Sequence, residues 1–444
     1  MGKTRFTFPG RRAFLLLWVG QLVSLLGSGL TAFALGVWIY QRTNSVLLLA
    51  LNMLAYALPQ VVLSPLAGAL VDRWDRRVAM IVSDLGAGAA TLAIAFMYLL
   101  NAMSLPGIYA ATALMAAFAT LQWPAWSAAT TMLVPKEHLG RASGMVQLVD
   151  AVSSLGAPAI AGALYVIIGL GALVLMDVAT YVFSAVVMIW FVRVPAPARK
   201  TTAGQQKPSL WEDMAFGWRY IVARPGLLGL LLFFAATNFF NNMTSPLLQP
   251  MILDTWSPEV LGLIGSMLGV GTLVGTIIMS VWGGPRRRIL GLLGASVFSG
   301  LFLSLAGLKV SIALIAASGF AMMVLVPILN GCSQAIWQTK VEPELQGRVF
   351  SVRRMIAWSV SPLGILIAAP LADSYFKPLL VTGGPLAASV GRVMGVGPGR
   401  GIGLQIVVVG ALMAIVALVT LLFPRVRNVE AEIPDAVGEP TPSD

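Results

Sequence analysis

The sequence has very little of what enzymes commonly use for chemistry. Its 444 residues include one cysteine and one histidine. Cys332 alone excludes a disulfide framework, and Cys332 with His138 excludes a Cys/His metal cluster of the usual ligand spacing. Charge is also scarce, since Asp, Glu, Lys and Arg make up only 11% of the chain. No metal site and no cofactor is predicted.

Apolar sequence is present in great excess. Hydrophobic residues make up 58% of the chain, and the mean hydropathy is +0.85. No soluble core needs that much apolar sequence. Uncharged runs long enough to form a membrane helix, which needs about 20 residues, recur along the chain. The composition therefore predicts an all-α integral membrane protein.

Charges and Pro/Gly turns divide the apolar sequence into twelve predicted transmembrane helices. Their ranges are 13–40, 45–71, 78–100, 106–134, 142–168, 171–192, 226–253, 260–283, 288–308, 311–339, 349–372 and 401–424. Lys and Arg collect in cytoplasmic loops when a topology is correct. With both termini cytoplasmic, all but five of the 29 basic residues fall in cytoplasmic segments. The net charge of +11 is then a topology signal and an attraction to anionic membrane lipids, so nucleic-acid binding is not predicted.

An internal repeat indicates two related halves. VPKEHLGRASGMVQL (134–148) follows the fourth span, and VEPELQGRVFSVRRM (341–355) follows the tenth. The sequence thus predicts a six-helix bundle at 1–193, a cytoplasmic linker at 194–224, a second six-helix bundle at 225–424, and a disordered cytoplasmic tail at 425–444. Parallel repeats of this kind hold a substrate between the halves.

Uncharged polar residues recur near helical spacing in the first, fourth, seventh and tenth spans. This spacing gathers them on one face of each helix. One interpretation is hydrogen bonding between helices, which Ser, Thr, Asn and Gln commonly supply in membranes. The other is a polar cavity on the axis between the halves, because the same helices of each half carry the stripes. The predicted cavity residues are Gln21, Ser28, Trp123, Gln147, Asn238, Asn241, Asn242, Gln334 and Trp337.

The loop after the second span reads GALVDRWDRR (68–77) and resembles the signature of the major facilitator superfamily. In that family the aspartate and its basic neighbours form a cytoplasmic latch that braces the outward-facing state. An anion beside the positive end of a helix is physically favourable. The resemblance assigns the latch to Gly68, Asp72, Arg73, Arg76 and Arg77.

Further segments resemble one branch, the third drug:proton antiporter family, which includes macrolide-efflux proteins and the enterobactin exporter. They are QWPAWSAATTMLVPKEHLGRASG (122–144), MDVATYVFSA (176–185), QTKVEPELQGRVFS (338–351) and GVGPGRGIGL (395–404). The fifth span also resembles the family's antiporter glycine motif at Gly144, Gly156, Pro158 and Gly162. Ala157 and Ala161 replace two glycines that are usual in this motif.

Three acids lie within predicted spans, and ionisable residues there are functional candidates. Asp150 is nine residues beyond Arg141, which places it near the midplane as a proton-coupling candidate. Asp84 lies one to two turns inside the cytoplasmic face, where the latch network is expected. Asp177 falls in a segment that the family shares, so packing is the expected role. All three remain candidates for proton coupling.

The function predicted from the sequence is export of a small hydrophobic compound from a bacterial cell, at the inner membrane, by a monomer. The resemblance implies proton antiport. The polar stripes hold no Lys or Arg at mid-depth, which favours a neutral or cationic substrate over an anion. Two alternatives remain: an exporter or flippase of a siderophore or lipid, and a membrane-embedded enzyme. An enzyme would need a nucleophile, base or metal cluster, and the sequence offers no such constellation.

Overall fold

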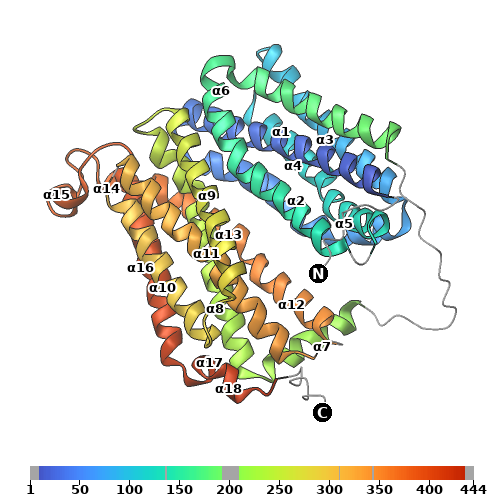
Figure 1. Ribbon diagram of the computed structural model, residues 1–444. Coiled ribbons are helices and arrows are strands. Elements are labelled where there is room, and N and C mark those ends of the chain that lie inside the picture. Colours follow the sequence, from blue (N-terminus) through green and yellow to red (C-terminus); the bar gives the residue numbers. More distant parts are fainter. Residues whose placement is uncertain (1–9, 136–137, 193–209, 310, 343–344, 436–444) are drawn as a thin grey trace. The chain divides into compact units, whose positions relative to one another are not determined.

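The computed structural model describes residues 10–135, 138–192, 210–309, 311–342 and 345–435. Over these ranges the regular secondary structure is helical throughout (Figure 1). Hydrocarbon favours this outcome because an α-helix satisfies its own backbone N–H and C=O groups. The chain divides into two compact units: Met1–Thr201 with Trp256–Ser266, and Thr202–Thr255 with Met267–Asp444. We call them the first unit and the second unit.

Eleven helices among the described residues are long and apolar enough to cross a membrane, whereas the sequence predicts twelve. The difference arises at the predicted spans 142–168 and 171–192. Both lie in α6 (Leu139–Trp190), where two helices meet across a kink at Gly169 with no loop between them. Gly169 has a φ of 74°, a conformation that glycine adopts without steric cost.

The first unit is built around α1, which packs along α6, while α3 packs against both α6 and α4 (Figure 1). Small residues permit the close approach of α1 to α6. A Cβ at Gly29 would lie 2.5 Å from the Cβ of Ala157, and small residues at such contacts let helix backbones come together. The helices are α1 (Arg11–Thr43), α2 (Val46–Arg73), α3 (Arg76–Leu99), α4 (Leu105–Ala119), α5 (Gln122–Leu133) and α6.

The predicted span 106–134 is interrupted, so that α4 ends at Ala119 and α5 begins at Gln122. Pro124 explains the interruption, because it has no N–H to donate to the carbonyl four residues earlier and its ring crowds that turn. In the last turn of α4 the Thr120 hydroxyl donates to the Ala116 carbonyl over 2.8 Å. The first two residues of α5, Gln122 and Trp123, line a cavity in this unit.

In the second unit α10 packs against α16 and α11, and α8 packs against α13 and α16. Glycines again allow backbone contact, since a Cβ at Gly300 would lie 2.6 Å from the Gly410 carbonyl oxygen. A π-helical segment, Leu371–Phe376, continues α13. The helices from α7 on are α7 (Leu210–Val222), α8 (Pro225–Leu253), α9 (Pro258–Trp282), α10 (Arg288–Leu308), α11 (Ile312–Lys340), α12 (Gln346–Ser359), α13 (Ser361–Pro370), α14 (Lys377–Leu379), α15 (Val390–Met394), α16 (Arg400–Leu422), α17 (Pro424–Arg427) and α18 (Val429–Glu432), of which α9 is shared between the two units.

Two segments that the sequence assigns to a linker and a tail contain helices. Residues 193–209 and 436–444 lie outside the described ranges, but α7 occupies the rest of the predicted linker and packs against α8 and α12. The sequence predicts a disordered tail at 425–444, but residues 425–435 contain most of α17 and all of α18. Val426 and Val429 explain the difference, because both side chains are buried in the core of this unit.

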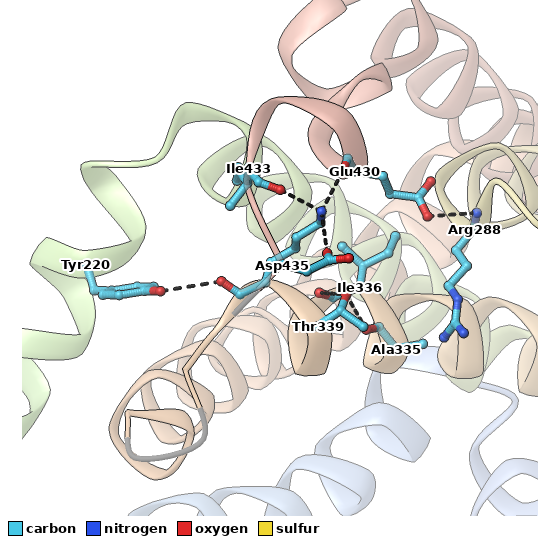
Figure 2. A network of polar contacts seen from close by, with 9 residues as sticks. Tyr220, Arg288, Ala335, Ile336, Thr339, Glu430, Ile433 and Asp435 are labelled. Carbon is cyan, nitrogen blue, oxygen red and sulfur yellow. Dashed lines mark hydrogen bonds and ion pairs between the residues drawn. The ribbon is translucent and has the colours of Figure 1, made fainter. Parts of the chain in front are cut away.

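The tail is held by polar contacts at the end of α11, shown in Figure 2. The Lys340 ammonium donates to the carbonyl oxygens of Glu430 and Ile433 and pairs with Asp435 Oδ1 at 2.7 Å. An ammonium has three donors, and these oxygens use all three. The Glu430 carboxylate accepts from the backbone N–H groups of Arg288 and Ile289 at the start of α10. The tail therefore links the start of α10 to the end of α11.

Replacing Glu430 by glutamine is expected to loosen the tail. The amide keeps the shape but removes the negative charge from the positive end of α10, a loss of about 1 kcal/mol. The change should lower the melting temperature in detergent and speed proteolysis of a C-terminal tag. Glu432→Gln, at an exposed position two residues later, is the matched control. Equal proteolysis of the two variants would show that the Glu430 contact does not hold the tail.

Candidate substrate and proton site

The first unit contains a cavity of about 410 Å³, lined by residues from α1 to α6. Apolar and aromatic side chains form part of the wall, as in most small-molecule sites. Among the described lining residues there is one carboxyl group, that of Asp84, and no Lys or Arg. The polar and aromatic lining residues are Gln21, Ser24, Ser28, Tyr56, Gln60, Ser83, Gln122, Trp123, Trp126 and Tyr181.

Four polar side chains form a closed ring of hydrogen bonds, and three of them, Gln21, Asp84 and Gln122, line the cavity. Ser184 Oγ donates to Asp84 Oδ2 over 2.7 Å, and Gln122 Nε2 donates to Asp84 Oδ1 over 3.0 Å. Gln122 Nε2 also donates to Gln21 Oε1 over 2.7 Å. Gln21 Nε2 closes the ring by donating to Ser184 Oγ over 3.4 Å. The ring connects α1, α3, α5 and α6 around a single carboxyl group.

Asp84 is deeply buried, with 1% of its surface exposed. Its described partners, Ser184 and Gln122, are neutral. A carboxylate removed from water without a cation carries a large desolvation cost, whereas the neutral acid does not. An acid in this position can therefore hold a proton while it is enclosed and release it when water or a cationic ligand reaches it.

The sequence interpretation placed Asp84 with the latch network, and the structure places it elsewhere. Its described hydrogen bonds go to the ring and not to Arg76 or Arg77. Two turns of α3 separate Asp84 from Arg77. In addition, the Asp84 carboxyl group points toward α5 and α6, where its hydrogen-bond partners lie. Sequence spacing predicts a depth for Asp84 but cannot predict its hydrogen-bond partners.

Ser28 and Trp123, which the sequence assigns to a cavity between the halves, line this cavity of the first unit. Ser28 Oγ and the Tyr181 hydroxyl are hydrogen-bonded at 2.9 Å, which joins α1 to α6. The Trp123 side chain is 49% exposed and meets Trp126 edge to face, with ring centroids 6.0 Å apart. An exposed indole face can stack on an apolar ring or bind a cation.

Gln147 and Asp150 lie within α6, together with Gly144 of the glycine motif. The side chains of these residues are outside what the structure describes. Their proposed roles in the cavity and in proton coupling therefore remain predictions.

In the second unit the polar stripe of α8 makes contacts between helices. Asn238 Nδ2 donates to the Ala357 carbonyl over 3.0 Å, which joins α8 to α12. Asn242 Nδ2 donates to Ser361 Oγ over 3.0 Å, which joins α8 to α13. Asn241 is partly exposed beside them. Two of the three asparagines, Asn238 and Asn242, thus form hydrogen bonds between helices.

The polar stripe of α11 contacts Arg353, which the sequence places near the cytoplasmic start of the predicted span 349–372. Arg353 lies in α12 and donates to Gln334 Oε1 and Ser333 Oγ, each over 3.1 Å. Its guanidinium also lies over the Trp337 ring, 5.1 Å from the centroid. Trp337 is fully buried. Gln334 and Trp337 are therefore brought together, but around a cation of the chain itself.

The latch residues are only partly described, since the surroundings of Gly68 and the side chains of Asp72 and Arg73 fall outside the description. Arg77 can be placed: its Nε donates to the Met188 carbonyl over 2.8 Å, and its Nη2 donates to the carbonyl of Ile189. These carbonyls belong to the last turn of α6, where a cation is favourable. Arg76 donates to the Trp74 carbonyl within the same turn of chain.

Replacing Arg77 by alanine is expected to destabilise the first unit by about 1 kcal/mol, because two carbonyls at the end of α6 lose a charged donor. The melting temperature in detergent measures the effect. Arg77→Lys keeps a cation that can reach one carbonyl, so its loss should be smaller. Identical melting of the alanine variant and the unmodified protein would remove Arg77 as a brace of α6.

The described part of the antiporter glycine motif, Gly156 to Gly162, lies where α6 meets neighbouring helices. A Cβ at Gly156 would approach the Leu26 side chain to 3.4 Å, and one at Gly162 would lie 2.9 Å from the Cα of Gly262. Gly262 belongs to the part of α9 that groups with the first unit. Pro158 lies inside α6 between the two glycines. Close backbone approach is the use the motif predicts for its small residues.

Sequence reasoning did not select several members of the site. Gln122 and Ser184 complete the ring, and Tyr181 contacts Ser28. A signal for the last two exists in the segment 176–185, because Asp177, Tyr181 and Ser184 are spaced by four and three residues and share one helical face. For Gln122, the preceding helix break hides the periodicity of its span.

Comparison with known proteins gives a consistent result. The family model of the Major Facilitator Superfamily matches residues 17–365. Macrolide efflux protein A of Streptococcus pyogenes is 30% identical over 374 residues, which cover 81% of this chain and 89% of the relative. The multidrug efflux pump Tap of Mycolicibacterium fortuitum is 28% identical over 379 residues, covering 82% and 90%. A bacterial homologue of the human lysosomal transporter Spinster, solved in an inward-facing state, has the same fold at 15% identity, with a TM-score of 0.69 over 95% of this chain and 97% of that one.

Proposed function

Because the chain belongs to the Major Facilitator Superfamily, we propose that it exports a small hydrophobic compound, neutral or cationic, in exchange for protons. It is a membrane transporter with relatives named as efflux pumps, and not an enzyme. The observation that carries the finer proposal is the hydrogen-bonded ring around Asp84 in the cavity wall.

Proton coupling is supported by the position of Asp84. A coupling group has to bind a proton in one state of the transporter and lose it in another, and it has to sense the substrate. Asp84 is buried, has neutral partners and lines the cavity. A substrate cation or water that enters the cavity would stabilise the carboxylate and expel the proton. Substrate and proton then exclude one another, which is the requirement for antiport.

The substrate class is supported by the cavity lining. Among its described residues, amides, hydroxyls, two indoles and one carboxyl face the cavity, without a basic side chain. An anion would have no charged donor there and would carry its desolvation cost. Arg353 does not change this inference, because it lies in the second unit, where it donates to Ser333 and Gln334, and it does not line this cavity.

The remaining features of the proposal follow the family. We infer twelve transmembrane helices, with the two halves of α6 counted separately, cytoplasmic termini, and alternating access between two six-helix halves. We assign the chain to a bacterial inner membrane because its efflux relatives are bacterial. Asp72 is proposed as the acid of the cytoplasmic latch, and the working unit is proposed to be a monomer.

The deciding experiment uses an efflux-deficient bacterial host. Cells with this chain should accumulate less erythromycin and less ethidium than cells with the empty vector, and a protonophore should remove the difference. The same cells should retain an anionic, phosphorylated probe unchanged. Protonophore-resistant efflux would overturn proton coupling. Selective efflux of an anionic metabolite would support the siderophore alternative instead.

A further inference from the structure

A second carboxyl group of the first unit has no role in the ring. Asp177 lies on α6 and is fully enclosed, with none of its surface exposed. Its Oδ1 is 3.4 Å from the Thr180 hydroxyl. Its Oδ2 has no hydrogen-bond partner among the described residues. A buried carboxyl oxygen without a partner is costly and calls for an explanation.

The surroundings of Asp177 are neutral hydroxyls. The Ser28 and Thr31 hydroxyls of α1 lie beside the carboxyl group, but neither completes a hydrogen bond to Oδ2. The titratable groups near Asp177 are the phenols of Tyr56 in α2 and Tyr181 in α6. Asp84 of α3 lies near the other side of this set, because it too interacts with Tyr181. No Lys or Arg forms a described ion pair with it. A neutral acid is the form that such surroundings accommodate.

Asp177 is separated from the cavity by a short set of hydroxyl groups. Ser28 lies beside Asp177, lines the cavity and is hydrogen-bonded to the Tyr181 hydroxyl. Along α6, Asp177, Tyr181 and Ser184 are spaced by four and three residues, so they occupy one face and lead from the enclosed acid to the ring. The Ser28 hydroxyl also contacts the Ser24 carbonyl at 3.0 Å, so its single proton can point in either direction.

We propose that Asp177 binds a second proton of the transport cycle, and that the Ser28 and Tyr181 hydroxyls pass this proton between Asp177 and the cavity. The transfer is a proton hop: the carboxyl O–H bond breaks as a hydroxyl oxygen gains that proton, and the hydroxyl releases its own proton to the next acceptor. No electrons are exchanged, and the negative charge stays on Asp177. This inference rests on proton antiport as the function, with Asp84 as the first site.

Infrared spectroscopy of the purified protein in lipid vesicles tests the proton site without any substrate. A protonated carboxylic acid has a carbonyl-stretch band that shifts on exchange into D₂O. The unmodified protein should show a band that Asp177→Asn lacks. Ser28→Ala should keep the band but slow its exchange, and Ser28→Thr should restore the rate. Absence of any band assignable to Asp177, or equal exchange in Ser28→Ala, overturns the proposal.

The reversal potential of transport in proteoliposomes tests participation in the cycle, with ethidium as the probe. Asp177→Asn should shift this potential to a lower proton-to-ethidium ratio while transport remains coupled through Asp84. A merely structural Asp177 would change the rate and leave the ratio unchanged, which would overturn the second-proton role. If the unmodified protein does not move ethidium or erythromycin against a gradient, the proposed function fails, and the infrared result still decides whether Asp177 binds a proton.

Discussion

Asparagine in place of Asp84 is expected to abolish uphill export while downhill exchange of the substrate survives. The amide fits the ring, because its oxygen can accept from Gln122 and its NH₂ group can donate to Ser184 Oγ. The fold and the cavity should therefore be preserved. The amide cannot bind or release a proton at any working pH, so the cavity site at which substrate and proton exclude one another is lost.

Ethidium transport in proteoliposomes measures the effect. The unmodified protein should build an ethidium gradient that grows with the imposed proton gradient, and Asp84→Asn should only let ethidium equilibrate. Ser83→Ala is the matched control, since Ser83 adjoins Asp84 and lines the same cavity. The Ser83 hydroxyl donates to the Phe118 carbonyl and takes no part in the ring. This variant should lose little transport. Uphill pumping by Asp84→Asn with the same pH dependence would move coupling to Asp150 or Asp177.

The helices could be predicted because a bilayer leaves few choices. A run of about 20 apolar residues forms a helix, and charge asymmetry orders the runs. The interruptions were less predictable. Pro124 breaks the fourth predicted span, whereas Pro158 and Pro246 remain inside α6 and α8. Whether a proline breaks a membrane helix depends on which neighbours satisfy the freed carbonyl, and that is a tertiary property.

The polar stripes predict which residues share a face of a helix and leave open whether that face lines a cavity. Gln21, Ser28 and Trp123 line the cavity of the first unit. In the second unit, Asn238 bonds to a backbone carbonyl and Gln334 accepts from Arg353. Periodicity shows which residues share a face of a helix, but not what that face meets. The ring around Asp84 needs four helices in register, and no single helix carries that information.

The partners of the charged residues in the C-terminal tail could not be predicted from the sequence either. A short acidic segment rich in Pro is typical of disorder, yet Glu430 caps α10 and Lys340 binds the tail. Lys340 counted toward the cytoplasmic charge that orients the chain, and its side chain is nevertheless 4% exposed. Composition predicts the side of the membrane on which these residues lie. It could not identify their partners, because the tail and α11 are distant in sequence.

Adding one methyl group at Gly27 is expected to destabilise the first unit strongly. A Cβ there would lie 2.1 Å from the Thr180 hydroxyl oxygen and 2.8 Å from Asp177 Oδ1, closer than real Cβ contacts. Thr180 cannot simply rotate, because its hydroxyl donates to the Asp177 carbonyl over 2.7 Å. The methyl group would therefore push α1 away from α6, at a cost of about 1 to 3 kcal/mol for an overpacked site.

Gly20→Ala is the matched control for Gly27→Ala, and the pair separates packing from helix propensity. Both glycines lie in α1, seven residues apart and facing α6, but a Cβ at Gly20 would meet Ser184 Oγ at an ordinary 3.5 Å. Alanine favours a helix over glycine by up to about 1 kcal/mol, so Gly20→Ala should be neutral or stabilising. Melting curves in detergent, followed by size-exclusion chromatography, should show Gly27→Ala falling well below both the unmodified protein and Gly20→Ala. Equal melting of the two variants would mean that α1 and α6 separate at no cost, and it would remove the close contact that encloses Asp177.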